Sequence, residues 1–588
     1  MAHQNPLYSP IASQDGFTRV FELDPGSFND HIKLRLRVVQ LPAYSDYEAL
    51  SYVWGTEVAP QTACVDDHEL SITLNLDIAL RHFRLKDTAR TLWVDAVSIN
   101  QRDIKERSLQ VQLMREIYSS ARAVIVWLGS LEDQQEQDAL RWAEMDHIPE
   151  SLDERTTLVL GLRKIHDRPW FTRVWVVQEL ALARDEPPMY LGKETVFWSN
   201  MLAYCNRFRR AQLKEDIRRR PRDAKGALLT FGSMYHDLHL GDVRNTSIQS
   251  ALSTKMFFTR SLCSTDPRDK VFGILGLSSE SALERMTGSV VADYSKPVQQ
   301  VFSETMAKIL HEDTLRAIST WPLQPLKSQH SDDATRVADL PSWVPDFSMR
   351  LAYAYDVETY LLPHDLAPGF DDIEDLFDIP GVVLPIATVS SNSSILHTAG
   401  VYIGSVAVTS SVYMPVPPAN SGQMWLSART LNHIYTTYAE PRQIDSHMLF
   451  YTMLGRDMTV PDLCEVRDKA ADWRPIADAK DTEEAHDLGW YAVSAPALHR
   501  TMFITEEGHV GLAYHPDVFN GIRVGDVVVG LYGLNIPYVL RQVGGGYQVI
   551  NIAHVAGHEF GHEFFAEGED GATWRDFEKF GLQEYALV

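Results

Sequence analysis

The first third of the chain alternates short apolar runs with helical patterns, an arrangement typical of α/β proteins. Between Ile32 and Val38, apolar side chains alternate with basic ones, and this period of two predicts a half-buried strand. Further strands are predicted from the apolar runs 49–54, 91–94, 123–128 and 188–191. The first three of these runs end at Gly55, Asp95 and Gly129, residues that often follow a strand.

Helical patterns separate these runs. Residues 74–85 and 174–183 each predict a helix. Asp103, with Glu106 three residues later, matches a capping box that starts another helix. The apolar stripe of that helix recurs every four residues, at Leu109, Leu113, Ile117 and Ala121. Strands that alternate with helices imply βαβ units, hence a parallel sheet covered on both faces.

The rest of the chain has a different organisation. We expect a flexible tail at 1–15, an α/β domain at 16–200, a mainly helical region at 201–320 and a mixed α+β region rich in strands at 321–588. In the last region, 526–530 and 538–541 are strand-like. Gly544 to Gly546 then predicts a tight turn into a strand at 547–552, which would form a hairpin.

Composition and charge narrow the class of protein. The 588 residues are 45% hydrophobic and 23% charged, which is ordinary globular composition and enough for several domains. Lys and Arg total 54 against 79 Asp and Glu, a net charge of −25. An acidic surface repels the phosphates of nucleic acids and anionic lipids, so we expect neither as a partner. The basic stretches 207–210 and 218–222 are interpreted as solvated helix faces.

The sequence predicts a cytoplasmic protein. Its four cysteines are scattered and form no C-x-x-C pair, as expected in a reducing compartment. No basic segment followed by an apolar stretch is present at the N-terminus, so no signal peptide is expected. No apolar run approaches the ~18 residues that would suggest a membrane span.

Several sequence motifs resemble those of the fungal heterokaryon-incompatibility (HET) domain family. They are 47–55 (YEALSYVWG), 92–101 (LWVDAVSINQ) with 106–107 and 110–111, 117–118 with 126–129 (VWLG), and 168–179 (RPWFTRVWVVQE). Segments 266–271, 293–294 and 340–346 also look like ones common in these proteins, so the resemblance spans about 17–350. It implies a role in vegetative incompatibility, non-self recognition and programmed cell death in a filamentous fungus. It also implies protein partners from the incompatibility system and a homo-oligomer as one expected state.

One position departs from the family pattern. The family usually carries Cys where this chain has Ser98. The resemblance therefore implies no thiol nucleophile at this position.

HET domains in turn resemble TIR domains, some of which hydrolyse NAD. The resemblance implies an open, flavodoxin-like parallel sheet, and Trp175-x-x-x-Glu179 looks like the TIR W-x-x-x-E element. It makes Glu179 the candidate catalytic carboxylate, since cleavage of the nicotinamide–ribose bond develops an oxocarbenium-like cation that a carboxylate stabilises. NAD would be a substrate, and no bound cofactor is expected. Ligands of open α/β sheets bind outside the carboxyl ends of the strands, which makes substrate-binding candidates of Trp54, Gly55, Asp95, Arg173 and Trp175.

Each of these residues also has a structural interpretation. Trp175 is consistent with core packing, and Glu179 near a helix start with a favourable interaction with the helix dipole. Asp95 at a strand end is consistent with capping the next turn. Arg173 could contact a phosphate or pair with a carboxylate.

The C-terminal region contains an H-E-x-x-H sequence, His558-Glu559-Phe560-Gly561-His562. On a helix, His558 and His562 would share one face and could bind zinc, with Glu559 as base. Gly557 and Gly561 each disfavour a helix by about 1 kcal/mol relative to Ala, and the segment closely follows a predicted strand. We interpret the match as accidental and expect no metal site.

Three functions therefore remain open. The leading hypothesis is a HET-family effector or regulator of cell death, in which the C-terminal region restrains or triggers the N-terminal domain. The second is an NAD glycohydrolase that uses Glu179. The third is a non-enzymatic signalling scaffold, or an accessory protein of a metabolic gene cluster.

Overall fold

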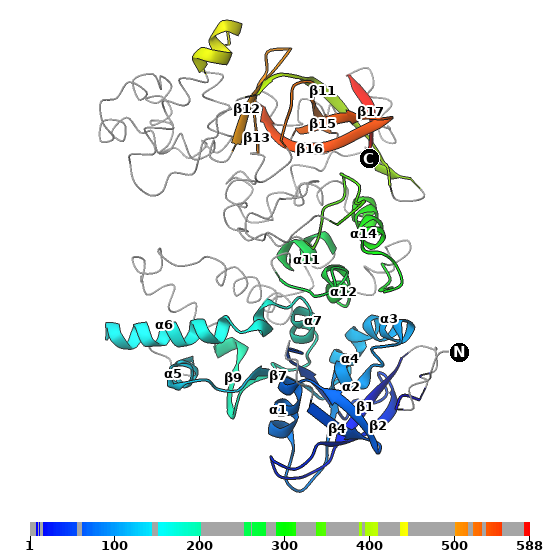
Figure 1. Ribbon diagram of the computed structural model, residues 1–588, viewed down its shortest axis with the longest axis vertical. Helices are drawn as coiled ribbons and strands as arrows, with labels where there is room; N and C mark the ends of the chain where they lie inside the picture. Colours follow the sequence, from blue (N-terminus) through cyan, green and yellow to red (C-terminus); the bar gives the residue numbers. More distant parts are fainter. Residues whose placement is uncertain are drawn as a thin grey trace. The chain divides into compact units, whose positions relative to one another are not determined.

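The computed structural model shows two compact units, residues 1–297 and 298–588. The structure describes residues 7–9, 11, 16–55, 61–143, 151–200, 252–259, 262–277, 290–312, 337–348, 387–390, 394–409, 435–444, 500–514, 521–531, 537–555 and 581–588. Each unit is built around its own sheet (Figure 1).

The first unit contains a nine-stranded sheet with the order β5-β4-β2-β1-β6-β3-β7-β8-β9. Its strands are β1 (Phe17–Leu23), β2 (Lys33–Gln40), β3 (Glu48–Ser51), β4 (Gln61–Val65), β5 (His68–Ile72), β6 (Arg90–Trp93), β7 (Ala123–Gly129), β8 (Pro188–Leu191) and β9 (Glu194–Phe197). The strands predicted at 91–94, 123–128 and 188–191 are confirmed, and the one predicted at 49–54 ends earlier, at Ser51.

Four adjacent strands of this sheet, β6, β3, β7 and β8, are parallel. Numbered along the chain they lie in the order 2-1-3-4, which is also the order that begins doubly wound flavodoxin-like sheets. The prediction of a parallel sheet is correct for these four strands and wrong for the whole sheet, which is mixed. The difference arises because β1 pairs antiparallel with both β2 and β6, and β9 pairs antiparallel with β8.

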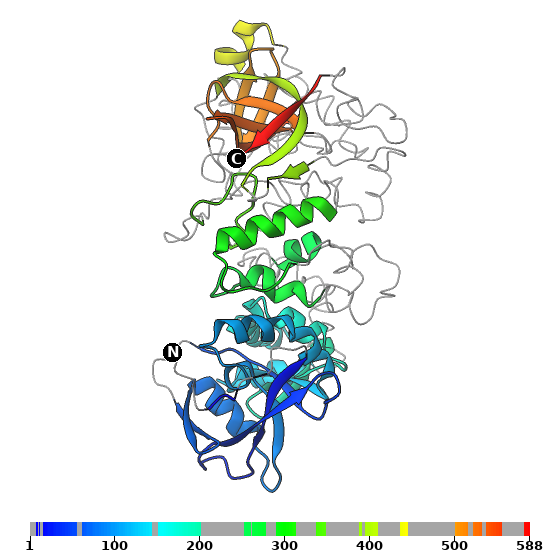
Figure 2. The ribbon, with the colours of Figure 1, turned by 90° about the vertical axis from the view of Figure 1, so that its right-hand side faces the viewer.

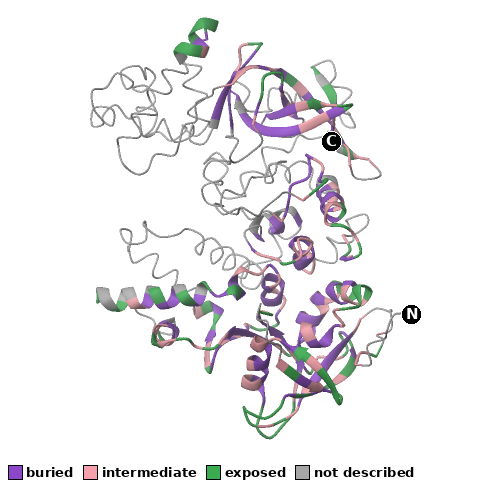
Figure 3. Cartoon of the chain, in the orientation of Figure 1, coloured by how far each residue is buried: buried purple, intermediate pink, exposed green. Residues whose placement is uncertain are grey.

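Helices cover both faces of the parallel strands. Helix α1 (Leu74–Phe83) packs on the face that presents Leu50 and Tyr52. Helix α4 (Met114–Ser120) and the residues that follow helix α7 (Val176–Ala181) pack on the opposite face, which presents Ala49. The central strands are consequently buried on both sides, as Figure 3 shows.

The helix predicted to start at Asp103 is confirmed at its beginning and wrong in its length. Asp103 accepts hydrogen bonds from the backbone N–H groups of Lys105 and Glu106, at 3.0 and 3.1 Å, and α3 (Ile104–Gln112) follows it. The chain then leaves helical geometry at Leu113 (φ −86°, ψ 1°) before α4 begins. The predicted stripe is confirmed at Ile117 and Ala121, which are buried. It is wrong in α3, which buries Ser108, Gln110 and Val111 instead and leaves Leu109 43% exposed.

The remaining helices of the first unit are short or peripheral. They are α2 (Asp95–Ser98), α5 (Gln134–Ala143), α6 (Leu152–His166), the 3₁₀ turn η1 (Pro169–Thr172), α11 (Leu252–Thr259) and α12 (Asp269–Leu275). The helix predicted at 174–183 is confirmed as α7, which has six residues. Of the region expected to be mainly helical, residues 201–251 lie outside the described part of the chain.

The second unit begins with α14 (Val298–Glu312) and contains an eight-stranded sheet. Its strands are β10 (Ala387–Val389), β11 (Leu396–Thr409), β12 (Arg500–Thr505), β13 (Val510–Tyr514), β14 (Val527–Leu531), β15 (Tyr538–Val543), β16 (Gly546–Val555) and β17 (Leu582–Leu587); two short turns, η5 (Tyr435–Ala439) and η6 (Glu440–Arg442), complete the described elements. The sheet closes on itself because β11, the long curved strand of Figure 2, pairs with both β12 and β14. The predicted strand-rich region and its hairpin, now β15 and β16, are confirmed.

The downstream motif 340–346 lies in the second unit. Trp343 is fully buried, and its indole N–H donates to the Ser394 carbonyl at 3.2 Å. Ser342 accepts from the Val549 N–H at 2.9 Å and donates its own backbone N–H to the Val588 carbonyl at 3.0 Å. The motif therefore joins the last strand to β16.

Gly511 in β13 allows a close approach that a larger residue would block. A Cβ there would lie 2.1 Å from Cζ of Phe503, whose ring fills the interior of the closed sheet. Gly511→Ala should therefore destabilise the second unit by about 2 kcal/mol through overpacking. Thermal unfolding measures the effect, and Gly545→Ala, where a Cβ meets nothing within 4 Å, is the matched control. Equal stability of the two variants would contradict this packing.

None of the described helices combines the length and the apolar character needed to cross a membrane.

Candidate functional site

The carboxyl ends of β3 and β6 bring two predicted site residues together. The indole N–H of Trp54, after β3, donates to the carboxylate of Asp95, after β6, at 2.8 Å. Trp54 is 38% exposed and Asp95 is half-buried, so this edge faces solvent. Gly55 follows with φ +82°, a left-handed conformation that glycine adopts without a Cβ penalty.

Glu179 lies behind this edge, on α7, and is only 5% exposed. The Ser51 hydroxyl, on β3, donates to its carboxylate, and Ser51 in turn accepts from the Trp170 indole N–H at 2.8 Å. Tyr118 also hydrogen-bonds to Glu179. Burial raises the pKa of the Glu179 carboxyl to about 7, although the nearby Arg173 opposes the shift. Glu179 is therefore poised to ionise near neutral pH.

Arg173 connects the two carboxylates electrostatically. Its guanidinium donates to the backbone carbonyl of Tyr52, at the end of β3. Burial also raises the pKa of Asp95, and Arg173 opposes that shift too. The positive charge of Arg173 therefore acts on both Asp95 and Glu179. It reduces the repulsion between the two carboxylates when both are ionised.

Two buried tyrosines supply protonated hydroxyls next to these carboxylates. Burial raises the pKa of Tyr52 well above its usual range, and neighbouring Asp95 adds to the shift. Burial does the same for the pKa of Tyr118, with Glu179 as its largest charged contributor. Both hydroxyls therefore remain protonated at neutral pH and can donate hydrogen bonds.

Trp175 lies apart from this group. It is half-buried at the start of α7, packs against the core on the α4 face and hydrogen-bonds to Asp269 at the start of α12. The structure thus brings Trp54, Asp95, Arg173 and Glu179 to one edge, with Gly55 next to Trp54, and places Trp175 between two helices.

Sequence reasoning did not single out Ser51, Tyr52, Tyr118 and Trp170 as site residues. Ser51 and Tyr52 stand in the same motif as Trp54, immediately before the strand end, and this position was the signal that could have found them. Tyr118 and Trp170 carry no such signal, because their apolar rings are typical of core residues.

Ser98 has a structural role. It is fully buried on α2, and its hydroxyl accepts from the backbone N–H of Val94 at 3.2 Å. Its carbonyl accepts from the Arg19 guanidinium at 3.3 Å. The Ser98 side chain is therefore buried and bonded to the backbone.

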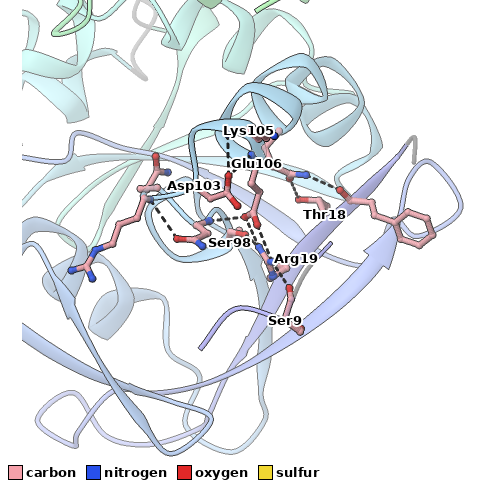
Figure 4. A network of polar contacts seen from close by, with 12 residues as sticks. Ser9, Thr18, Arg19, Ser98, Asp103, Lys105 and Glu106 are labelled. Atoms are coloured by element: carbon pink, nitrogen blue, oxygen red, sulfur yellow. Dashed lines mark hydrogen bonds and ion pairs between the residues drawn. The ribbon is translucent and has the colours of Figure 1, made fainter. Parts of the chain in front are cut away.

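Arg19 of β1 holds the segment that carries Asp95 and Ser98, as Figure 4 shows. Its guanidinium makes two hydrogen bonds with Glu106, at 2.6 and 3.1 Å, and one with the Ser9 carbonyl at 2.6 Å. Glu106 also accepts from the Asn100 N–H at 2.7 Å. Residues 98–106 are therefore fixed to the sheet through one buried ion pair.

A second buried ion pair closes the end of β7. Arg168 donates to the carbonyls of Leu128 and Ser130, at 2.9 and 3.0 Å, and bonds to Glu136, which is fully buried. The Leu128 and Ser130 carbonyls at this strand end are therefore occupied by Arg168.

No group of His, Cys, Asp or Glu side chains among the residues that the structure describes is arranged to hold a metal ion. The H-E-x-x-H sequence at His558 and His562 lies outside those residues.

Comparison with known proteins finds sequence similarity over the part of the chain that carries these residues. Residues 47–179 match the sequence model described as "Heterokaryon incompatibility protein (HET)", and all the site residues discussed above lie within that range. This part of the chain is therefore similar in sequence to a HET domain. It is 26% identical over 431 residues to "Heterokaryon incompatibility protein 6, OR allele" of Neurospora crassa. That alignment covers 60% of this chain and 61% of the relative, so it spans less than two thirds of the relative's length. No solved structure matches the chain significantly.

Proposed function

We propose that this protein acts in heterokaryon incompatibility in a filamentous fungus, in the recognition of non-self and the cell death that follows. The HET domain and the name of the Neurospora relative support this role. We propose further that the domain acts as an NAD glycohydrolase with Glu179 as its catalytic carboxylate, working in the cytoplasm with protein partners and as a homo-oligomer. The buried Glu179, whose pKa is near neutrality, lies behind the carboxyl ends of the parallel strands β3 and β6, and this is the observation that supports the enzymatic role.

In the proposed reaction, the bond between the ribose C1′ and the nicotinamide nitrogen breaks, and its electron pair leaves with nicotinamide. Positive charge develops on the ribose, which ionised Glu179 would stabilise before water adds to C1′ and loses a proton. A ribose hydroxyl would replace Ser51 or Tyr118 as a hydrogen-bond donor to Glu179. Asp95, at the exposed edge beside Trp54, can accept a second hydroxyl.

Purified protein incubated with NAD is expected to release nicotinamide, measured by chromatography. Glu179→Gln should lower the rate at least ~100-fold, because the variant lacks the stabilising charge. The wild-type rate should rise as the pH increases through about 7, where the Glu179 carboxyl ionises. Glu69→Gln, an exposed exchange on β5, is the control. Absence of turnover in both dilute and concentrated preparations would contradict the enzymatic role.

A scaffold without catalysis is the second candidate, and the burial of Glu179 favours it. A carboxylate that is 5% exposed and bonded to Ser51 and Tyr118 is also what a structural role requires. The scaffold predicts that Glu179→Gln leaves cell death intact when the gene is expressed in the fungus. Loss of killing in a variant that is folded and equally abundant would argue against it.

A further inference from the structure

Residues 262–277 and 290–296, here called the clamp, lie beyond the range that matches the family and yet contact the helix that carries Glu179. The backbone N–H of Cys263 donates to the Thr172 carbonyl at 2.5 Å, and the Cys263 carbonyl accepts from Val174 at 3.0 Å. Arg173 and Cys263 form a parallel bridge. The clamp therefore pairs with the backbone immediately before α7.

Helix α12 of the clamp packs closely against α7. A Cβ at Gly273 would lie 3.1 Å from the Val174 side chain, and one at Gly276 would lie 2.7 Å from the Gln178 side-chain oxygen. Arg115 of α4 donates to the Gly276 carbonyl at 2.6 Å. The two glycines allow a helix-to-helix approach that larger residues would prevent.

Asp269 connects the two parts of the clamp to α7. Its carboxylate accepts from the Tyr294 hydroxyl at 2.5 Å and hydrogen-bonds to Trp175, the first residue before α7. Arg268, paired with Asp266, donates to the carbonyls of Tyr294 and Lys296 at 2.7 and 2.8 Å.

The second part of the clamp, residues 290–296, is bound to helix α3. The Arg107 guanidinium lies 3.8 Å from the centre of the Tyr294 ring. The Tyr294 N–H donates to the Ser108 hydroxyl at 3.1 Å, and Gln112 donates to the Ala292 carbonyl at 3.0 Å. The clamp thus joins α3, which follows the Asp95 segment, to α7, which carries Glu179.

We propose that the clamp sets the position of α7 in the HET domain, with Asp269 and Tyr294 as positioning residues for Glu179. The chain continues from Lys296 into the second unit, which starts at Val298. Any effect of the clamp on NAD turnover rests on the proposed function, whereas its effect on the position of α7 does not.

Tyr294→Phe in the full chain tests this role, because it removes only the hydroxyl that binds Asp269. Amide hydrogen exchange across 176–181 should accelerate at least ~10-fold, while exchange in β1 and β2 stays within twofold of wild type. Tyr402→Phe, which removes an exposed hydroxyl bonded to Glu507 in the second unit, is the matched control. Unchanged exchange in α7, or an equal increase throughout the first unit, would overturn the proposal.

The pH dependence of α7 opening separates positioning by Asp269 from simple packing. The pKa of Asp269 is raised to about 6, chiefly by burial and also by Asp266, against the opposing effects of the Tyr294 and Trp175 hydrogen bonds and of Arg107. A solvated Asp has a pKa of about 3.9, so the closed clamp holds a proton that the open one releases between these values. Opening of α7 should therefore become easier as the pH rises from about 4 to about 6. Glu179, which α7 carries, titrates in an overlapping range, so Asp269→Asn should reduce this dependence to the part that Glu179 contributes.

These measurements remain informative if the enzymatic proposal fails. If the wild-type protein releases no nicotinamide, catalysis by Glu179 is contradicted, but the amide hydrogen exchange measured in α7 still tests the clamp. Conversely, an identical pH dependence of α7 opening in the wild type and in Asp269→Asn would overturn the clamp even if NAD is hydrolysed.

Discussion

Glu179→Gln is expected to stabilise the first unit by about 3 kcal/mol at pH 8. The carboxyl of Glu179 has a pKa of about 7 in the folded chain against 4.5 for an unperturbed glutamate, and each pKa unit corresponds to about 1.4 kcal/mol. The folded state therefore binds this proton more tightly than the unfolded state does. Stability contributed by the protonated group is fully present below pH 4.5 and is lost as the pH rises to 7.

Glutamine avoids this loss because it is neutral at every pH and can still accept the Ser51 hydrogen bond. In the variant, Arg173 still opposes the effect of burial on the pKa of Asp95. The gain from the substitution should shrink to about 1 kcal/mol at pH 5, where the wild-type side chain is already protonated in the folded protein. Residues that act in catalysis often reduce the stability of the fold. An increase in stability on removal of the Glu179 charge would fit that pattern.

Hydrogen exchange of the β3 and β7 amides at pH 5 and pH 8 measures the effect, since these buried strands report the stability of the first unit. The Glu69→Gln variant should match the wild type at both pH values. If Glu179→Gln destabilises the unit equally at both, ionised Glu179 is instead held favourably by Arg173, and its pKa is not raised.

Glu106→Gln is expected to destabilise the first unit by about 3–5 kcal/mol, because it leaves the Arg19 charge buried without a carboxylate. Arg19 is 1% exposed and Glu106 is 11% exposed, so water cannot replace the lost partner. The carbonyls of Ser9 and Ser98 remain as acceptors, but they carry no net charge.

The double variant Arg19→Met/Glu106→Gln should recover most of this loss. Methionine fills the apolar part of the arginine site without a charge, and glutamine can still accept from the Asn100 N–H. Chemical unfolding of the wild type, both single variants and the double variant forms a complete cycle that isolates the pair. A double variant as unstable as Glu106→Gln alone would show that geometry at position 106, rather than the buried charge, accounts for the loss.

The sequence predicts those elements whose signals are local. Strand β7 is buried on both faces and reads as a continuous apolar run, and the Asp103 cap lies within three residues of the groups it binds. Strand β1 has no such signal, because Thr18, Arg19 and Glu22 interrupt its apolar residues. Arg19 can be buried only because Glu106, 87 positions later, neutralises it.

The candidate site follows the same rule. Glu179 and Asp95 are found from motifs and strand ends, whereas their surroundings depend on contacts between distant segments. Ser51 reaches Glu179 across 128 positions, and no local pattern indicates that β3 and α7 meet there. The antiparallel pairing in the mixed sheet was not predicted for the same reason, since β1 precedes its partner β6 by about 70 residues.

The clamp has a consequence for the order in which the protein assembles during synthesis. The residues that hold α7 extend to Lys296, 117 positions after Glu179. At roughly 5–20 residues per second, they leave the ribosome roughly 6–23 s after the glutamate itself. Strands β1 to β8 can pair in that interval, but α7 reaches its final anchorage only when the clamp arrives. A nascent chain interrupted before residue 262 would thus contain the whole range of the family match and still lack every contact between the clamp and α7.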